Sequence, residues 1–160
     1  MNERALFLKY WVKEAETTRN VISRIPEDRS DYRPDPKARS ARELAWLLLR
    51  EDIALVEGME KGAFEWVELP APATVKEIVE TYERTREDLS KRLHAVDPSR
   101  WEGQVPFVFD GKEVMSATGW EGAWGFFFDL IHHRGQLSTY LRPMGSTVPQ
   151  IYGPSADEPM

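Results

Sequence analysis

Three segments of the sequence begin with the same four-residue pattern, and this pattern limits the fold more than any other feature. Each starts with Ser or Thr and has Glu three positions later, at residues 40–43, 74–77 and 118–121. In such a capping box the hydroxyl accepts a hydrogen bond from the backbone N–H of the Glu, whose carboxylate accepts one from the first residue. The pattern therefore predicts three helix starts at fixed positions.

Apolar residues recur at helical spacing after each of these starts, and also in a fourth segment near the N-terminus. The expected helices are residues 3–24, 41–57, 75–95 and 119–141. Each has roughly 20 residues and a length of about 30 Å. Helices of equal length that each carry one apolar face pack best as a four-helix bundle, so the expected fold class is all-α.

The connections between these helices are long. Residues 24–39 contain three prolines and cannot be helical throughout, and residues 58–73 form an apolar loop that should pack against the bundle. Within residues 96–117, two alternating stretches flank Asp110-Gly111, which predicts a small β-hairpin before the last helix. The tail after Pro143 should be extended, with the segment around Tyr152 folded back onto the bundle.

Composition excludes several classes of protein. The chain has 160 residues, which is typical of one domain spanning 1–160, and it has no cysteine, so it holds no disulfide, thiolate zinc site, iron–sulfur cluster or cysteine nucleophile. Its 21 basic and 27 acidic residues give a net charge of −6, which argues against nucleic acid as a partner. No apolar run reaches the length of a membrane span, and the N-terminus lacks the pattern of a signal peptide. We therefore expect a cytoplasmic protein with no membrane partner.

The last expected helix carries the most chemically informative residues. Asp129 and His133 are four positions apart, so they lie on one face and can both reach one metal ion or hydrogen-bond to each other. An isolated pair of this kind is more often a satisfied buried pair than a metal site. His132 points about 100° away from His133, and His94 is assigned to the surface at the end of the preceding helix. The adjacent carboxylates of Glu51 and Asp52 are assigned to a solvated face.

Two stretches resemble the DinB/YfiT-like superfamily: YRPDPKARSARELAWLL at residues 32–48, and HHRGQLSTYLRPMGSTVPQIYGPSAD at residues 132–157. The resemblance extends over essentially the whole chain. It implies a four-helix bundle with long crossing connections, and it implies a divalent metal, zinc or nickel, held by three histidines. One histidine belongs to the second helix and two, four apart, to the last. The family includes transferases and isomerases that depend on low-molecular-weight thiols, and its members are often dimers.

At the three positions where the resemblance implies histidine ligands, this chain has one histidine and two other residues. His133 is present, Asp129 stands at the first position of the pair, and Trp46 stands at the second-helix position. The indole N–H is a donor only and cannot bind a metal. The resemblance therefore implies a degenerate metal site in a small-molecule-binding bundle, with Trp46 close to Asp129 and His133.

Two alternatives stay open, and with them whether the chain is an enzyme. In the first, a divalent metal is held by Asp129 and His133 and completed by water or by Glu43, with Arg134 or Gln136 orienting ligands or substrate. The metal would activate a bacillithiol, mycothiol or glutathione-type thiol for S-transfer. In the second, Asp129 and His133 form a metal-free general-base pair.

Overall fold

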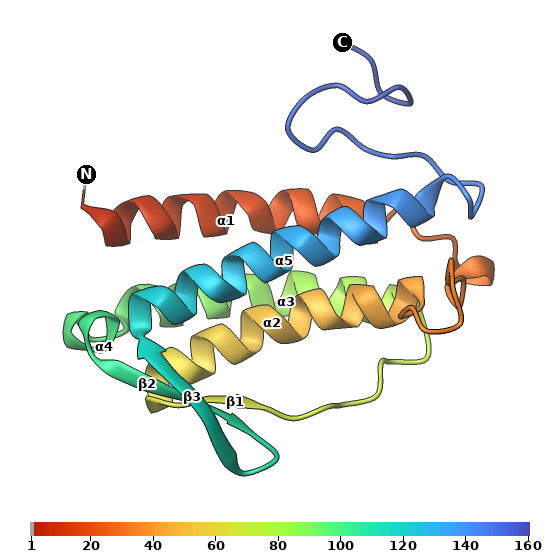
Figure 1. The fold of residues 1–160 in the computed structure, drawn as a ribbon. Helices are drawn as coiled ribbons and strands as arrows, with labels where there is room; N and C mark the ends of the chain where they lie inside the picture. Colours follow the sequence, from red (N-terminus) through yellow and green to blue (C-terminus); the bar gives the residue numbers. More distant parts are fainter. Residues whose placement is uncertain (1) are drawn as a thin grey trace.

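Four long helices form the body of the molecule, which we describe from a computed structural model covering residues 2–160 (Figure 1). They are α1 (Glu3–Ile22), α2 (Ala41–Lys61), α3 (Val75–Ala95) and α5 (Gly119–Leu141). Helix α2 packs against both α3 and α5, while α1 packs against the same two helices from the other side. The expected bundle is confirmed, and α3 and α5 have the expected bounds.

The three capping boxes form as the sequence predicts. At the start of α2, the N–H of Ser40 donates to Glu43 Oε2 over 2.7 Å, and at the start of α5 the N–H of Thr118 donates to Glu121 Oε2 over 2.8 Å. Thr74 and Glu77 make the same pair of bonds at the start of α3. These bonds satisfy backbone donors that the first turn of a helix otherwise leaves free.

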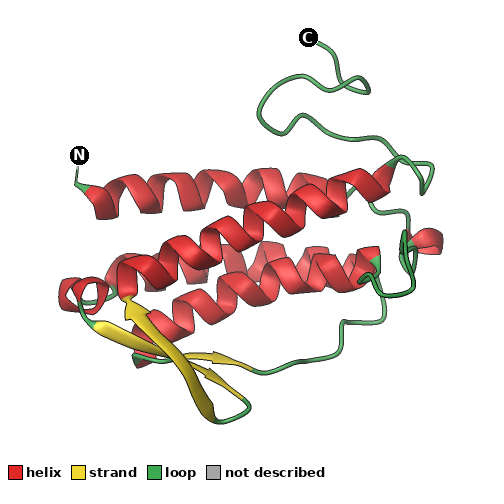
Figure 2. Cartoon of the chain, viewed as in Figure 1, coloured by secondary structure: helices red, strands yellow, loops and turns green. Residues whose placement is uncertain are grey.

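A small three-stranded sheet lies across one end of the bundle (Figure 2). Strands β2 (Gln104–Phe109) and β3 (Lys112–Thr118) form the expected hairpin, with positive φ angles at Asp110 and Gly111 in the turn. A third strand, β1 (Phe64–Trp66), pairs in parallel with β2 and was not expected. It has only three residues, too few for an alternating pattern to show in the sequence.

Two short helices complete the chain between residues 2 and 160: the 3-10 helix η1 (Glu27–Arg29) and α4 (Pro98–Glu102). They lie in connections whose prolines favour extended backbone, and α4 begins with Pro98 at its first position, where proline is tolerated. No helix among the described residues is both long enough and apolar enough to span a membrane.

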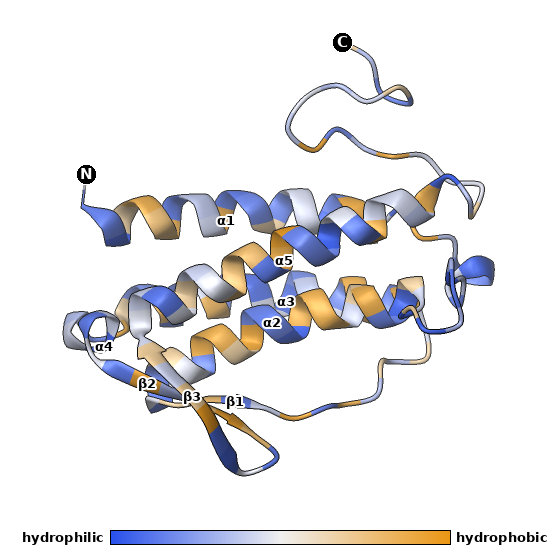
Figure 3. Ribbon diagram, viewed as in Figure 1, coloured by the Kyte–Doolittle hydropathy of each residue, from blue (hydrophilic) through white to orange (hydrophobic). Residues whose placement is uncertain are grey.

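Figure 3 shows apolar and polar residues alternating along each of the four long helices, as amphipathic helices require. The inward faces build a core in two parts, one around Leu44, Leu48 and Leu137, the other around Phe7 and Trp101. The sheet is attached to the second part by Phe64, which is buried against both α2 and α5.

The C-terminal tail contacts the bundle at Tyr152, as expected, but through the hydroxyl and not by burial of the ring, since the residue is 68% exposed. Its hydroxyl donates to Glu14 Oε2 over 3.0 Å and accepts a hydrogen bond of 2.6 Å from Arg134 Nη2. Since Glu14 belongs to α1 and Arg134 to α5, the tail is held by two helices.

Candidate metal centre

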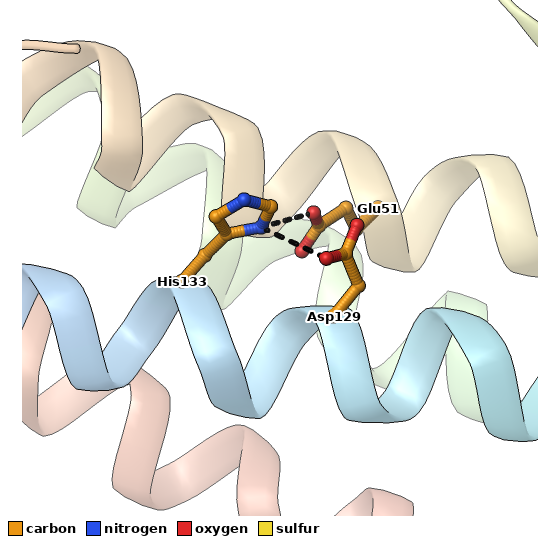
Figure 4. Close-up of side chains that lie close together, drawn as sticks. All are labelled: Glu51, Asp129 and His133. Atoms are coloured by element: carbon orange, nitrogen blue, oxygen red, sulfur yellow. Dashed lines mark hydrogen bonds and ion pairs between the residues drawn. The ribbon is translucent and has the colours of Figure 1, made fainter. Parts of the chain in front are cut away.

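Three side chains meet where α5 crosses α2: Glu51 from α2, and Asp129 and His133 from α5 (Figure 4). His133 Nδ1 lies 2.7 Å from Glu51 Oε1 and 3.7 Å from Asp129 Oδ1. One ligand atom from each residue falls within 4.8 Å of the other two. We call these residues the Glu51–Asp129–His133 cluster.

The cluster extends from the interior of the bundle to its surface. Asp129 and His133 are one turn apart on α5, which places both on the face that meets α2. The Glu51 side chain is 2% exposed, that of His133 19% and that of Asp129 56%. The cluster therefore has one buried carboxylate, one half-buried imidazole and one carboxylate open to solvent.

The assignment of Glu51 and Asp52 to a solvated face is wrong, since they are 2% and 5% exposed. Helix α2 is covered on one side by α5 and on another by α3, so two of its faces are interior. Glu51 faces α5, whereas Asp52 faces α1 and α3 and accepts hydrogen bonds from Trp11 Nε1 at 2.8 Å and Tyr82 Oη at 3.4 Å. The signal in the sequence was the apolar run on both sides of this acidic pair.

Helix α2 thus contributes Glu51 to the cluster, rather than Trp46. With 3.6 residues per turn, side chains five positions apart on a helix point about 140° from each other. The Trp46 indole N–H donates to the carbonyl of Leu69 over 3.2 Å, in the connection between β1 and α3. Glu43 is also outside the cluster, because its carboxylate caps α2 and pairs with Arg33 at 3.3 Å.

The other residues considered from sequence lie around the cluster. Arg134 is 1% exposed, faces α1 and pairs with Glu14 at 2.6 Å, so it is not free to orient a ligand at the cluster. Gln136 is exposed on α5. His94 is exposed as expected, and the exposed His132 has its ring 5.2 Å from that of His133.

Burial dominates the electrostatics of the cluster. It raises the pKa of Glu51 to about 7, against the opposing effect of the His133 hydrogen bond and with the help of the nearby Asp129 charge. The hydrogen bond to Glu51 in turn raises the pKa of His133. Both shifts favour the protonated forms, and the hydrogen bond between Nδ1 and Oε1 holds one of these protons.

One atom of the cluster has no partner. Glu51 Oε2 is buried and accepts no hydrogen bond from any residue between 2 and 160. A buried carboxylate oxygen left in this way carries an uncompensated desolvation cost. A divalent cation beside it would satisfy this oxygen and replace the proton between His133 and Glu51. One imidazole and two carboxylates are also a donor set that such ions accept, so the residues present fit a metal.

A groove of about 410 Å³ opens beside the cluster at Asp129. Its other walls include Phe107, Phe126, Phe128 and His132. A ligand in this groove would rest on aromatic rings and reach the exposed edge of the cluster.

Comparison with known proteins gives consistent results. The DinB family matches the chain over residues 1–160. An uncharacterised Bacillus subtilis (strain 168) protein, YrdA, is 23% identical over 161 residues, which covers 95% of this chain and 89% of YrdA. Two crystal structures have the same fold at 20% identity, both covering 91% of this chain. They are the DinB-like protein YjoA of Bacillus subtilis (96% of it covered, TM-score 0.72) and a DinB-like protein of Bacillus cereus ATCC 10987 (95% covered, TM-score 0.74).

Proposed function

This chain belongs to the DinB family, and on that basis we propose that Glu51, Asp129 and His133 bind one divalent cation beside a small-molecule site. The observation that carries the proposal is the buried, unpartnered Oε2 of Glu51 next to the other two donors. Stabilisation of a buried carboxylate requires a proton, a hydrogen-bond donor or a cation.

Glu51 compensates for the loss of the family histidines by supplying a third donor to the cation. With Trp46 and Asp129 at two of the family positions, a cation would have one imidazole and one carboxylate. Glu51 brings the set to three protein donors, the number typical of zinc sites that keep a position open for water or substrate. The two carboxylates also suit Mn²⁺, which prefers oxygen ligands more than zinc does.

Each residue then has a distinct part. Glu51 supplies the buried negative charge, His133 the nitrogen ligand, and Asp129 the exposed carboxylate at the groove. A cation held there would lower the pKa of a bound water or thiol. The rings of Phe126 and Phe128 would hold the apolar part of a small molecule against this edge.

Thiol S-transfer to an apolar electrophile is a narrower candidate, which the aromatic groove beside Asp129 favours. Its test is conjugation of glutathione or bacillithiol to a model aromatic electrophile, with and without added Zn²⁺ or Mn²⁺. Conjugation that requires both the cation and His133 would support it. Equal rates for the wild type and His133→Ala would contradict it.

The test of the cation site is calorimetric titration of chelator-stripped protein with Zn²⁺ and with Mn²⁺, together with the metal content after dialysis. The wild type should bind one cation, and Glu51→Gln and His133→Ala should each weaken binding at least tenfold, since even outer-shell changes cost about 10–100-fold. The matched control is Glu57→Gln, a more exposed carboxylate of the same helix, which pairs with Lys61. Absence of stoichiometric binding by the wild type, or equal affinity in Glu51→Gln, would contradict the proposal.

A further inference from the structure

A second cavity, of about 140 Å³, lies between the first half of α2 and the connection that follows β1. It shares no lining residue with the groove at Asp129. Its walls carry two indoles, those of Trp46 and Trp66, and two guanidinium groups, those of Arg39 and Arg50. Aromatic faces and fixed cations together are typical of a site for an anion with an apolar body.

The two arginines that line this cavity differ in whether a carboxylate pairs with them. Glu43 and Glu68 also line it, but each already has partners: Glu43 caps α2 and pairs with Arg33, and Glu68 pairs with Arg39 at 3.5 Å.

Arg50 has no such partner. Among residues 2–160, no carboxylate lies within ion-pair distance of its guanidinium and no hydrogen bond satisfies it, and its Nε is buried. The Nε has no accessible surface, so an acceptor in the cavity would have to reach the terminal Nη groups, which no residue between 2 and 160 engages.

The size and the walls of the cavity limit that acceptor. An apolar cavity of about 150 Å³ holds one benzene molecule, so this cavity has room for a single ring. The N–H of Trp46 is engaged by Leu69, which leaves the face of the indole for apolar contact. One unpaired cation matches one negative charge, whereas a dianion would be repelled by Glu43 and Glu68.

We propose that this cavity binds a small aromatic monocarboxylate. The carboxylate hydrogen-bonds to Arg50, and the ring packs against Trp46 and Trp66. The proposal does not depend on a cation at the Glu51–Asp129–His133 cluster.

The test uses benzoate as the probe, titrated into the full-length protein and followed by calorimetry and by the indole ¹H–¹⁵N signals of the tryptophans. The wild type should bind one benzoate saturably and shift the Trp46 and Trp66 signals. Arg50→Met should weaken binding at least tenfold, because the charge-assisted bonds are lost. Arg50→Lys keeps the positive charge but lacks the planar guanidinium, so its affinity for benzoate should lie between those of the wild type and Arg50→Met. Arg84→Met, which removes an exposed arginine of α3, is the matched control.

Neutral benzamide and dianionic phenyl phosphate test the charge requirement on the wild type, where no variant has to fold. Both should bind at least tenfold more weakly than benzoate. The proposal is overturned if the wild type shows no saturable binding at millimolar benzoate, if benzamide binds as well, or if folded Arg50→Met binds like the wild type. Glu51→Gln should keep benzoate binding whether or not it binds a cation, so the two proposals fail separately.

Discussion

Glu51 and Asp52 are consecutive residues with side chains buried on different sides of α2. Burial raises the pKa of Asp52 to about 7, an effect opposed by its hydrogen bond from Trp11 and aided by the neighbouring Glu51 charge. Both carboxyl groups therefore hold a proton in the folded chain at pH values where they lose it in the unfolded chain.

The sign of the resulting pH dependence follows from this difference. A carboxyl group with a raised folded-state pKa contributes stability that is complete below its ordinary pKa and is lost as the pH rises through about 7. We expect the free energy of unfolding of the cation-free protein to fall between about pH 4, the ordinary range of these carboxyl groups, and about pH 7. Asp52→Asn should flatten this fall, because the amide oxygen still accepts from Trp11 but does not ionise. Urea unfolding at several pH values measures the effect.

The control for this prediction is Asp88→Asn, which removes an exposed carboxylate of α3. A variant Asp52→Asn with the same pH dependence as Asp88→Asn would show that the buried carboxyl group does not titrate in this range.

At the scale of elements, the attachment of the sheet depends on two glycines. An added Cβ at Gly58 of α2 or at Gly122 of α5 would lie 2.2 Å from the ring of Phe64. The ring is itself fixed, since it packs against Phe107 and Phe126 at centroid distances of 4.7 and 5.2 Å. The sheet therefore joins the bundle where two helices leave room for one ring.

We expect Gly122→Ala to lower the free energy of unfolding by about 1–2 kcal/mol, since overpacking exceeds the gain in helix propensity. Gly125→Ala, three residues along the same helix, has open space at the added Cβ and should be neutral or stabilising by up to about 1 kcal/mol. Thermal or urea unfolding of the pair measures the difference. Equal stabilities would show that Phe64 can move aside.

The sequence could predict where the helices start better than where α2 ends. The capping boxes located the starts of α2, α3 and α5, because they are local patterns. Gly58 was interpreted as the start of a loop, yet α2 continues to Lys61 and ends at Gly62, which has a φ of 84°. The sequence alone does not distinguish Gly58, which makes room for Phe64 within the helix, from Gly62, which ends it.

The sequence could likewise predict only part of the candidate site. Asp129 and His133 could be found because their spacing on one helix brings them together. Glu51 could not, because its approach to His133 depends on how α2 and α5 cross. Spacing within one helix cannot encode this tertiary contact.

At the scale of the whole molecule, α5 links the proposed site to the rest of the bundle. Its face toward α2 carries Asp129 and His133, and the next residue, Arg134, faces α1. A cation at the cluster would therefore join α5 to α2 and stabilise the folded state only.

We expect saturating Zn²⁺ or Mn²⁺ to raise the melting temperature of the wild type by several degrees, since a hundredfold excess over Kd is worth about 2.7 kcal/mol. Chelation should reverse the shift. The shift should shrink as the pH falls below about 7, because protons compete for Glu51 and His133. Differential scanning fluorimetry measures all three effects. A shift of equal size in Glu51→Gln would place the cation elsewhere.

The face of α5 that is turned toward α1 contacts the C-terminal tail through Arg134. The side chains of Arg134 and Glu14 are 2% and 6% exposed, and the Tyr152 hydroxyl bonds to both. We expect Arg134→Met to cost about 3–5 kcal/mol, because it leaves Glu14 buried and unpaired, and the further change Glu14→Gln to recover part of that loss. Tyr152→Phe should cost about 1–3 kcal/mol, because the hydroxyl makes two hydrogen bonds and each is usually worth about 0.5–1.5 kcal/mol.

Urea unfolding measures these costs, and Tyr10→Phe, at an exposed tyrosine of α1, is the control for Tyr152→Phe. The decisive comparison is limited proteolysis of the tail. If Tyr152 fastens the tail to α1 and α5, cleavage after residue 142 should be faster in Tyr152→Phe and in Arg134→Met than in Tyr10→Phe. Equal cleavage rates would mean that the other contacts of the tail, such as that of Asp157 with Arg142 at 3.0 Å, hold it without Tyr152.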